Sequence, residues 1–360
     1  MPPWVPLWGA GAGGPGPPYS GTSCVCETTA CPLPRPLLVI GCEPRVFEPV
    51  PIQLQPPDVA PYRYGNTGIE YVTTLDGGQP GPHVVINGLT HGNEICGAIA
   101  IDALFRLGVK PLRGKLTLSL ANVAAYQTFD RTAPYAARFV DEDFNRLWSP
   151  DVLDSRRDSA ELRRARALRP VFDAADVLLD VHSMTNDTPP LTLCGRTGRG
   201  RDLARALGYP AWIVADEGHA AGRRLIDYDG FAEADGTRTA VLVECGQHWR
   251  AETGAVAVET CLRFLLHLGM VDPALARPRL RRHAEPRRVV EVTQAVTARG
   301  DSFHFNAAYA GLEIVPKAGT VIGHDGEEPL ATPYDDCVLI MPARRVRPGQ
   351  TAVRLGRIVE

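Results

Sequence analysis

Residues 81–108, GPHVVINGLTHGNEICGAIAIDALFRLG, join a short apolar run to a segment with helical periodicity. The apolar run is bounded by turn residues, which is typical of a strand buried on both faces. Apolar residues then recur at helical spacing as far as Gly108, a residue type that commonly ends a helix. A buried strand followed at once by a helix is the repeating unit of α/β domains.

The same alternation continues on both sides of this unit. Further strands are predicted for IEYVTTLDGG, KLTLSLAN, DVLLDVH, AWIVA and RTAVLVECG. Further helices are predicted for DSAELRRARALRPVFDAA, RDLARALG and GAVAVETCLRFLLHLG. The pattern predicts an α/β domain with a mixed, largely parallel sheet that helices cover on both faces. Active sites in such folds lie at the carboxyl ends of the strands.

Changes in composition divide the chain into three parts. Residues 1–45 are rich in Pro and Gly, and we expect them to be a disordered extension. Residues 46–275 hold the α/β pattern and form the predicted main domain. After a basic linker, short strands and turns over residues 286–360 predict a small β domain, either a barrel or a sandwich.

Charge and hydropathy exclude several classes of protein. The 360 residues have a formal net charge of −3 and no general basic footprint, so we expect no nucleic-acid partner. No apolar run reaches the roughly 20 residues of a membrane span, and no signal peptide is evident, which favours the cytoplasm. The nine cysteines, four of them at positions 24, 26, 31 and 42, are an odd number and are expected to be reduced thiols. A homo-oligomer is compatible with the sequence.

Two histidines and one glutamate lie where strands of the predicted sheet end. His91 and Glu94 follow the HVVI strand, and His182 ends the LLDVH strand. Two His and one Glu with an open fourth position are the ligand set of several catalytic zinc hydrolases. Imidazole and carboxylate suit zinc better than magnesium, which prefers an octahedron of oxygens. His-x-x-Glu is also a frequent accident, so the spacing alone leaves a polar turn open.

Two further acids accompany these residues. Asp180 lies two residues before His182, where it would be part of the structure around the site. Glu244 ends the buried VLVECG strand, and an interior carboxylate is costly unless something pairs with it. Beside a metal that polarises a carbonyl, Glu244 could take a proton from water as general base and deliver it to a leaving nitrogen. A buried salt bridge of Glu244 is the structural alternative.

The segment RFVDEDFNRLW, residues 138–148, contains a candidate binding site for a carboxylate. Arg138 and Arg146, with Asn145, could hold a substrate carboxylate by charge-assisted hydrogen bonds. Asp141 and Asp143 could orient the two arginines. The alternative is a cluster of surface ion pairs at the start of a helix, which would contribute little to stability.

GLTHGNE, RFVDEDFNR, LLDVHS and VLVECG occur in the order and approximate spacing of the succinylglutamate desuccinylase and aspartoacylase family. That family resembles the zinc carboxypeptidases in fold. The similarity covers about residues 80–250, and the terminal β domain also resembles the one that the family carries. Phe144 stands where the family often has Leu, and the PKAGTVIGHDG region resembles uncharacterised bacterial members rather than aspartoacylase.

The resemblance implies hydrolysis of a small N-acyl amino acid or related amide. It implies one zinc ion per chain, held by His91, Glu94 and His182, with Glu244 as general base. Arg138 resembles the family arginine near the scissile carbonyl, and Asn145 with Arg146 resembles the pair that binds the substrate carboxylate. Tyr309 and either Arg223 or Arg224 are candidates for further substrate contacts.

Two alternatives stay open beside this zinc-dependent amidohydrolase. A carboxypeptidase would use the same zinc and base but bind the terminal carboxylate of a short peptide. A non-catalytic binding protein on the same fold is the second alternative. The presence of all three metal ligands and of Glu244 argues against it, since a degenerate site usually loses one of them.

Overall fold

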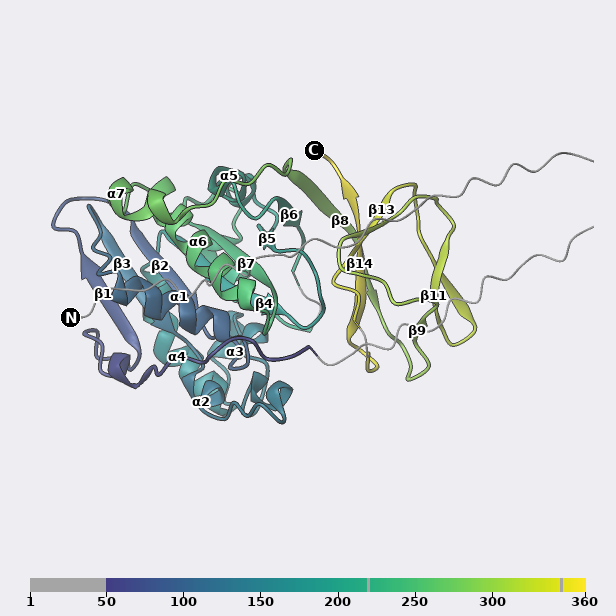
Figure 1. Ribbon diagram of the computed structural model, residues 1–360. Coiled ribbons are helices and arrows are strands. Elements are labelled where there is room, and N and C mark those ends of the chain that lie inside the picture. Colours follow the sequence, from purple (N-terminus) through teal and green to yellow (C-terminus); the bar gives the residue numbers. More distant parts are fainter. Residues whose placement is uncertain (1–49, 219–220, 344–345) are drawn as a thin grey trace, which may run out of the picture. The chain divides into compact units, whose positions relative to one another are not determined.

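The computed structural model describes residues 50–218, 221–343 and 346–360 (Figure 1). The extension expected over residues 1–45, with the cysteines at positions 24, 26, 31 and 42, lies outside the described residues. The described cysteines are free thiols, as expected, and all of them are buried: Cys96, Cys194, Cys245, Cys261 and Cys337.

Eleven strands of the described residues form one mixed sheet, in the order β1-β3-β2-β4-β7-β5-β6-β8-β14-β13-β10. The strands before the linker are β1 Val72–Asp76, β2 His83–Gly88, β3 Lys115–Leu120, β4 Val177–Met184, β5 Leu191–Leu193, β6 Trp212–Ala215 and β7 Thr239–Gln247. The central pairs β3–β2, β2–β4 and β4–β7 are parallel, while β1 and β5 join the sheet antiparallel to β3 and β7. The predicted mixed, largely parallel arrangement is therefore confirmed for this part of the sheet.

Helices cover the two faces of this sheet. They are α1 Ile95–Arg106, α2 Val123–Tyr126, α3 Pro150–Leu153, α4 Ala160–Asp173, α5 Gly198–Leu207, α6 Ala251–His267 and α7 Pro273–Ala276, with short 3-10 turns at Ala60–Tyr62, Pro134–Arg138, Phe144–Arg146, Leu225–Asp227, Asp229–Phe231 and Arg277–Arg279. In Figure 1, α1 and α6 lie side by side on one face of the sheet, and these two helices contact each other.

Alternate residues of β2 explain why its sequence is continuously apolar. Val84 and Ile86 belong to the core cluster that contains the buried side chains of α1, α5 and α6. Val85 belongs to a second cluster, which contains the buried side chains of α4. Because consecutive side chains of a strand point to opposite faces, a strand covered on both sides needs apolar residues at every position.

The strands after the linker continue the same sheet. They are β8 Arg288–Thr297, β10 Glu313–Val315, β13 Cys337–Ile340 and β14 Thr351–Ile358. β8 pairs in parallel with β6, with Trp212 opposite Arg288, and β14, β13 and β10 follow antiparallel to one another. A separate three-stranded sheet is formed by β9 His304–Phe305, β11 Val321–Asp325 and β12 Glu328–Ala331.

The C-terminal strands have a core of their own in addition to this shared sheet. A cluster that includes Ile322, Leu339, Val353 and Leu355 is buried among them. The β-rich character expected for residues 286–360 is therefore present. The boundaries of the catalytic and C-terminal domains remain predictions, because pairing between β6 and β8 joins the two regions without a break.

Candidate metal centre and substrate pocket

The turn that follows β2 brings His91 and Glu94 together. Glu94 is the residue immediately before α1, so its side chain starts at the junction of turn and helix. A Cβ atom at Gly92 would lie 2.4 Å from the backbone carbon of Ala125, which leaves room only for glycine. The backbone at Gly92, between the two predicted ligands, thus packs tightly against the backbone of Ala125. This contact restricts the conformations that the turn can adopt.

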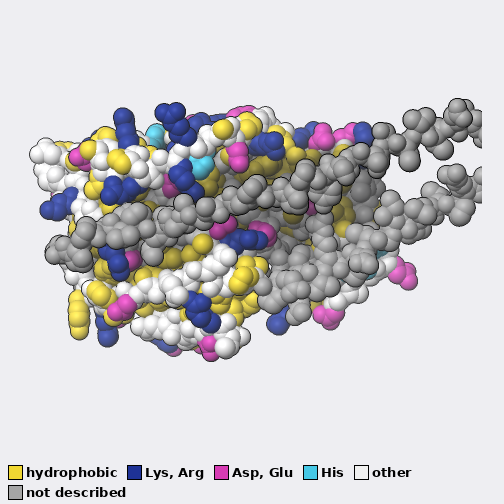
Figure 2. Space-filling model, in the orientation of Figure 1, with side chains coloured by type: hydrophobic (Ala, Val, Ile, Leu, Met, Phe, Trp, Pro, Cys, Tyr) yellow, Lys and Arg dark blue, Asp and Glu magenta, His cyan; other side chains and the backbone are white. Residues whose placement is uncertain are grey.

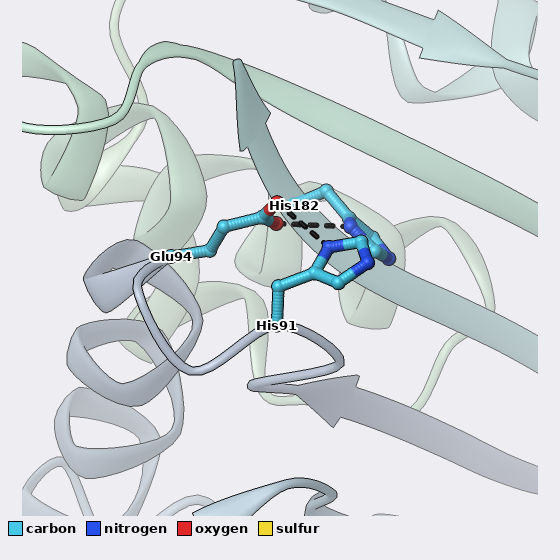
Figure 3. A group of neighbouring side chains, drawn as sticks. All are labelled: His91, Glu94 and His182. Atoms are coloured by element: carbon cyan, nitrogen blue, oxygen red, sulfur yellow. Dashed lines mark hydrogen bonds and ion pairs between the residues drawn. The ribbon is translucent and has the colours of Figure 1, made fainter. Parts of the chain in front are cut away.

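β4 brings the third residue to the same place. Glu94 Oε1 lies 2.8 Å from His91 Nδ1, and Glu94 Oε2 lies 2.9 Å from His182 Nδ1. Figure 3 shows the carboxylate of Glu94 facing both imidazole rings. One donor atom from each of the three buried residues lies within 4.8 Å of the other two, so the group could hold a metal ion.

Carboxylates also contact the outer nitrogens of both imidazoles. His182 Nε2 lies 2.8 Å from Asp180 Oδ2, and His91 Nε2 lies 3.0 Å from Asp143 Oδ1. Asp180 accepts further hydrogen bonds at Oδ1 from Asn87 Nδ2 at 2.8 Å and Thr90 Oγ1 at 2.9 Å. A carboxylate behind a ligating histidine fixes the tautomer and the ring orientation. This arrangement is typical of metal-binding histidines.

Both ring nitrogens of His182 face carboxylate oxygens, Nδ1 that of Glu94 and Nε2 that of Asp180. This surrounding negative charge favours a cation between His182 and Glu94. Burial lowers the pKa of His182, but Asp180 and Glu94 outweigh it and raise that pKa well above its usual value. Burial raises the pKa of Glu94, but His91 and His182 outweigh it and lower that pKa well below its usual value. Positive charge is therefore favoured between Nδ1 and the carboxylate, and either a proton or a metal cation satisfies this requirement.

Glu244 lies beside this group on β7. It is the register partner of His182 across the parallel β4–β7 pair. Its Oε2 atom is buried and has no hydrogen-bond partner among the residues that the structure describes. Burial, aided by the nearby charge of Glu94, raises the pKa of Glu244 to about 8. An unpaired carboxylate with a raised pKa beside a candidate metal site is suited to accept and return a proton.

The loop from Arg138 to Arg146 borders the same site. Arg138 forms an ion pair with Asp143 at 3.0 Å and approaches Glu94 Oε1 at 3.6 Å. Asn145 is buried, and its Oδ1 accepts a hydrogen bond from Leu225 N at 2.8 Å. The guanidinium of Arg146 donates to the backbone oxygen of Asn145 at 2.7 Å.

The seven residues predicted as metal ligands, as catalytic groups or as the carboxylate-binding pair line one cavity of about 240 Å³. They are His91, Glu94, Arg138, Asn145, Arg146, His182 and Glu244. On the face shown in Figure 2, charged side chains of both signs are interspersed, in agreement with the small net charge of the sequence. Among the described helices, none has both the length and the apolar content needed to cross a membrane.

Comparison with known families decides the relationship that the motifs suggested. Residues 80–268 match the family model described as succinylglutamate desuccinylase/aspartoacylase catalytic domain. The chain belongs to this family. Aspartoacylase from Xenopus tropicalis is 29% identical over 117 residues, which cover 30% of this chain and 36% of that protein. The match to this curated relative of the succinylglutamate desuccinylase/aspartoacylase family thus spans about a third of the relative's own length.

Solved structures of other proteins have a fold similar to that of this chain. Succinylglutamate desuccinylase from Vibrio cholerae is 18% identical, with a TM-score of 0.60, and the alignment covers 81% of this chain and 86% of that one. A succinylglutamate desuccinylase/aspartoacylase from Rhodobacter sphaeroides is 21% identical, with a TM-score of 0.58, covering 81% and 90% of the two chains. At these identities the comparison establishes a shared fold that includes the C-terminal strands.

The remaining candidates for substrate contacts differ in where they lie, and two residues of the cavity were not predicted from the sequence. Arg224 lines the cavity, whereas Arg223 lines a neighbouring one and Tyr309 packs against Phe305 in the C-terminal region. His248 and Arg354 also line the cavity and were not anticipated. An arginine within the apolar strand segment TAVRLG was the available signal for Arg354, because a charged residue in a buried strand is costly unless it is paired.

Proposed function

We propose that the protein is a zinc-dependent amidohydrolase that cleaves a small N-acyl amino acid or N-acylated amine. The observation that carries the proposal is the convergence of His91, Glu94 and His182 beside the unpaired carboxylate of Glu244. Family membership supports the same class of reaction, since the family and its similar proteins carry the names of enzymes that remove acyl groups.

The residues present fit a zinc ion. The Nδ1 atom of His182 and the carboxylate of Glu94 face each other at 2.9 Å, where a cation would relieve the need for an extra proton. Two imidazole nitrogens and one carboxylate are donors that zinc prefers, and they leave a position free for substrate. When bound, zinc supplies a Lewis acid that polarises a carbonyl and makes water a better acid.

The side chains around this site have distinct roles in the proposed reaction. Glu244 accepts a proton from the attacking water and returns it to the leaving nitrogen, which its raised pKa favours. Arg138 lies against His91 and Glu94, where its positive charge can stabilise negative charge that develops on the scissile carbonyl oxygen. Asn145 and Arg146 hold a carboxylate of the substrate by charge-assisted hydrogen bonds.

Metal analysis and one substitution test this function. We expect about one zinc per chain in the purified protein and release of a free amine from N-acetyl amino acids. Glu244→Gln should keep the zinc and lose hydrolysis by about 10²–10⁴-fold, because the amide cannot act as general base. Elemental analysis and amine release measure the two properties separately.

Three outcomes would contradict the proposal in different ways. Full activity of the Glu244→Gln protein would remove Glu244 from the mechanism. Cleavage of short peptides in preference to N-acyl amino acids would favour the carboxypeptidase alternative. Ligand binding without any turnover by the zinc-loaded protein would favour the non-catalytic alternative.

A further inference from the structure

Four guanidinium groups line the cavity, and they differ in whether a carboxylate neutralises them. The four residues are Arg138, Arg146, Arg224 and Arg354. The first of them, Arg138, is paired with Asp143 at 3.0 Å. A guanidinium that already faces a carboxylate contributes little net charge toward a substrate. The anions that this cavity accepts therefore depend on which arginines remain unpaired.

Arg224 is fully engaged with protein carboxylates. Its nitrogens donate to both oxygens of Asp216 at 2.9 and 2.7 Å and to both oxygens of Asp227 at 2.6 and 3.0 Å. Its side chain is only 4% exposed. Arg354, from β14, lies 3.6 Å from Asp216 Oδ2. These two arginines and two aspartates form a neutral group on one side of the cavity.

Arg146 differs from the other three arginines. Its hydrogen bond goes to the neutral backbone oxygen of Asn145, and no ion pair joins it to any of the residues that the structure describes. Burial lowers the pKa of Arg146 to about 10; the negative charge of Asp143 opposes this shift, and the positive charges of Arg138, Arg224 and Arg354 add to it. A largely buried cation that forms no direct ion pair is costly, so an anionic ligand at this position would be favoured.

Among the described residues, the remaining wall of the cavity offers no second cation that is free of an ion pair. Part of it is apolar and is made by Leu193, Leu242, Ile340 and Met341. The polar part is made by Ser183, Thr185 and His248. The imidazole of His248 lies 2.8 Å from Ser183 Oγ and 3.2 Å from Thr185 Oγ1, so these neutral groups satisfy one another. A second carboxylate would have to compete with Asp216 for Arg224 or Arg354 to find a cation.

We propose that the substrate carries one carboxylate, bound by Arg146, and that its other substituents are uncharged. This inference rests on the proposed amide hydrolysis and specifies its substrate class. N-acyl derivatives of neutral amino acids belong to that class, and N-acyl derivatives of dicarboxylic amino acids do not. The neutral arginine–aspartate group and the apolar wall exclude the second negative charge.

An isosteric pair of substrates tests the inference. N-acetyl-L-asparagine and N-acetyl-L-aspartate have almost the same shape and differ by one negative charge. We expect kcat/KM of the zinc-loaded protein to be higher for the asparagine derivative by roughly tenfold or more, because the extra carboxylate stays unpaired. N-acetyl-L-leucinamide, which lacks a carboxylate, should be a poorer substrate than N-acetyl-L-leucine by a similar factor.

Substitution of Asp216 gives the test a second arm. Asp216→Asn removes one carboxylate and leaves Arg224 and Arg354 with an uncompensated positive charge. The aspartate-to-asparagine ratio of kcat/KM should then rise by about tenfold. Asp227→Asn removes the other carboxylate and should change the ratio in the same direction, should the first variant not fold. Asp229→Asn is the matched control, since Asp229 is 53% exposed and pairs with Arg238, and it should leave the ratio unchanged.

Failure of the inference and failure of the proposed function are distinguishable. Equal or better cleavage of N-acetyl-L-aspartate by the unaltered protein would overturn the inference and leave amide hydrolysis standing. Absence of any hydrolysis would overturn the function. In that case calorimetric binding of the two acetyl amino acids to the zinc-loaded protein still decides the inference, which requires tighter binding of the asparagine derivative.

Discussion

Individual residues at the centre of the site illustrate what a linear pattern can predict. His91, Glu94, His182 and Glu244 lie where strands end or just beyond, and such positions converge in a parallel sheet. Their grouping was therefore predictable before any coordinates. The ion pair of Asp143 with Arg138 was also anticipated, but its contact with His91 was not, because Asp143 lies in a loop whose path no local periodicity encodes.

Arg146 is the residue whose loss should affect substrate binding most selectively. Arg146→Ala removes the unpaired guanidinium, so we expect kcat/KM for an N-acyl amino acid to fall by about 10–100-fold. Most of the loss should appear as a higher KM, because the guanidinium contacts a carboxylate that does not react. Steady-state kinetics at saturating zinc measure the two parameters.

Arg163→Ala is a suitable control for this change, because Arg163 is 59% exposed and pairs with Asp158 on the surface. Its kinetics should match those of the unaltered protein. An unchanged KM in the Arg146→Ala protein would remove Arg146 from the binding of the carboxylate.

At the scale of elements, α4 holds the loop that carries the proposed substrate-binding residues Asn145 and Arg146. The carboxylate of Glu161, in the first turn of α4, accepts hydrogen bonds from three consecutive backbone amides, those of Val140 at 2.6 Å, Asp141 at 3.0 Å and Glu142 at 3.2 Å. In return, Asp141 Oδ2 accepts from Ala160 N at 2.7 Å. These reciprocal bonds fix the loop between Arg138 and Arg146 against the start of the helix.

Glu161→Gln should loosen this connection, because an amide presents a donor group where the backbone amides need an acceptor. We expect a loss of about 1–3 kcal/mol in the free energy of unfolding. We also expect a higher KM for the N-acyl substrate, because the positions of Asn145 and Arg146 depend on the loop. Chemical denaturation and steady-state kinetics measure the two effects.

Glu252→Gln provides a matched control for the element-scale prediction. Glu252 occupies the corresponding position in the first turn of α6, but it is exposed. It should change neither stability nor KM appreciably. A Glu161→Gln protein with the stability and KM of the unaltered chain would show that the loop is held in place by other contacts.

The elements themselves could be predicted in so far as each carries its own periodicity. The buried strands and the amphipathic helices of the α/β part were found this way. β5 was not, because Leu191–Leu193 is a strand of only three residues and too short to show alternation. Its antiparallel pairing with β7 also depends on the loop that precedes it rather than on its own residues.

For the molecule as a whole, the sequence predicted the α/β class but not the continuity of the sheet. A change from helical periodicity to short strands indicates a new region. The change does not indicate which strand of the preceding sheet the first new strand will pair with. β8 pairs with β6 and extends the central sheet into the C-terminal region. Backbone pairing across this boundary couples the two regions.

This coupling predicts that the α/β part and the C-terminal strands unfold together. Differential scanning calorimetry should show a single cooperative transition, because opening the β6–β8 pair exposes the edge of both regions at once. Two separate transitions would show that the regions fold independently.

Binding of zinc should raise the temperature of this transition. Zinc at about 100 times its dissociation constant should stabilise the folded state by ~2.7 kcal/mol. His182→Ala should abolish this increase in the transition temperature.

The extended sheet also has a consequence for how the cavity can be altered. Ile340, Met341 and Arg354 reach the cavity from the C-terminal strands, whereas the candidate metal ligands and Glu244 come from chain segments that precede residue 250. One wall of the cavity is thus encoded in a different stretch of the gene from the proposed hydrolytic residues and from Arg146. Recombination or laboratory evolution confined to the last quarter of the coding sequence can therefore vary this wall while the proposed hydrolytic residues and Arg146 are inherited unchanged.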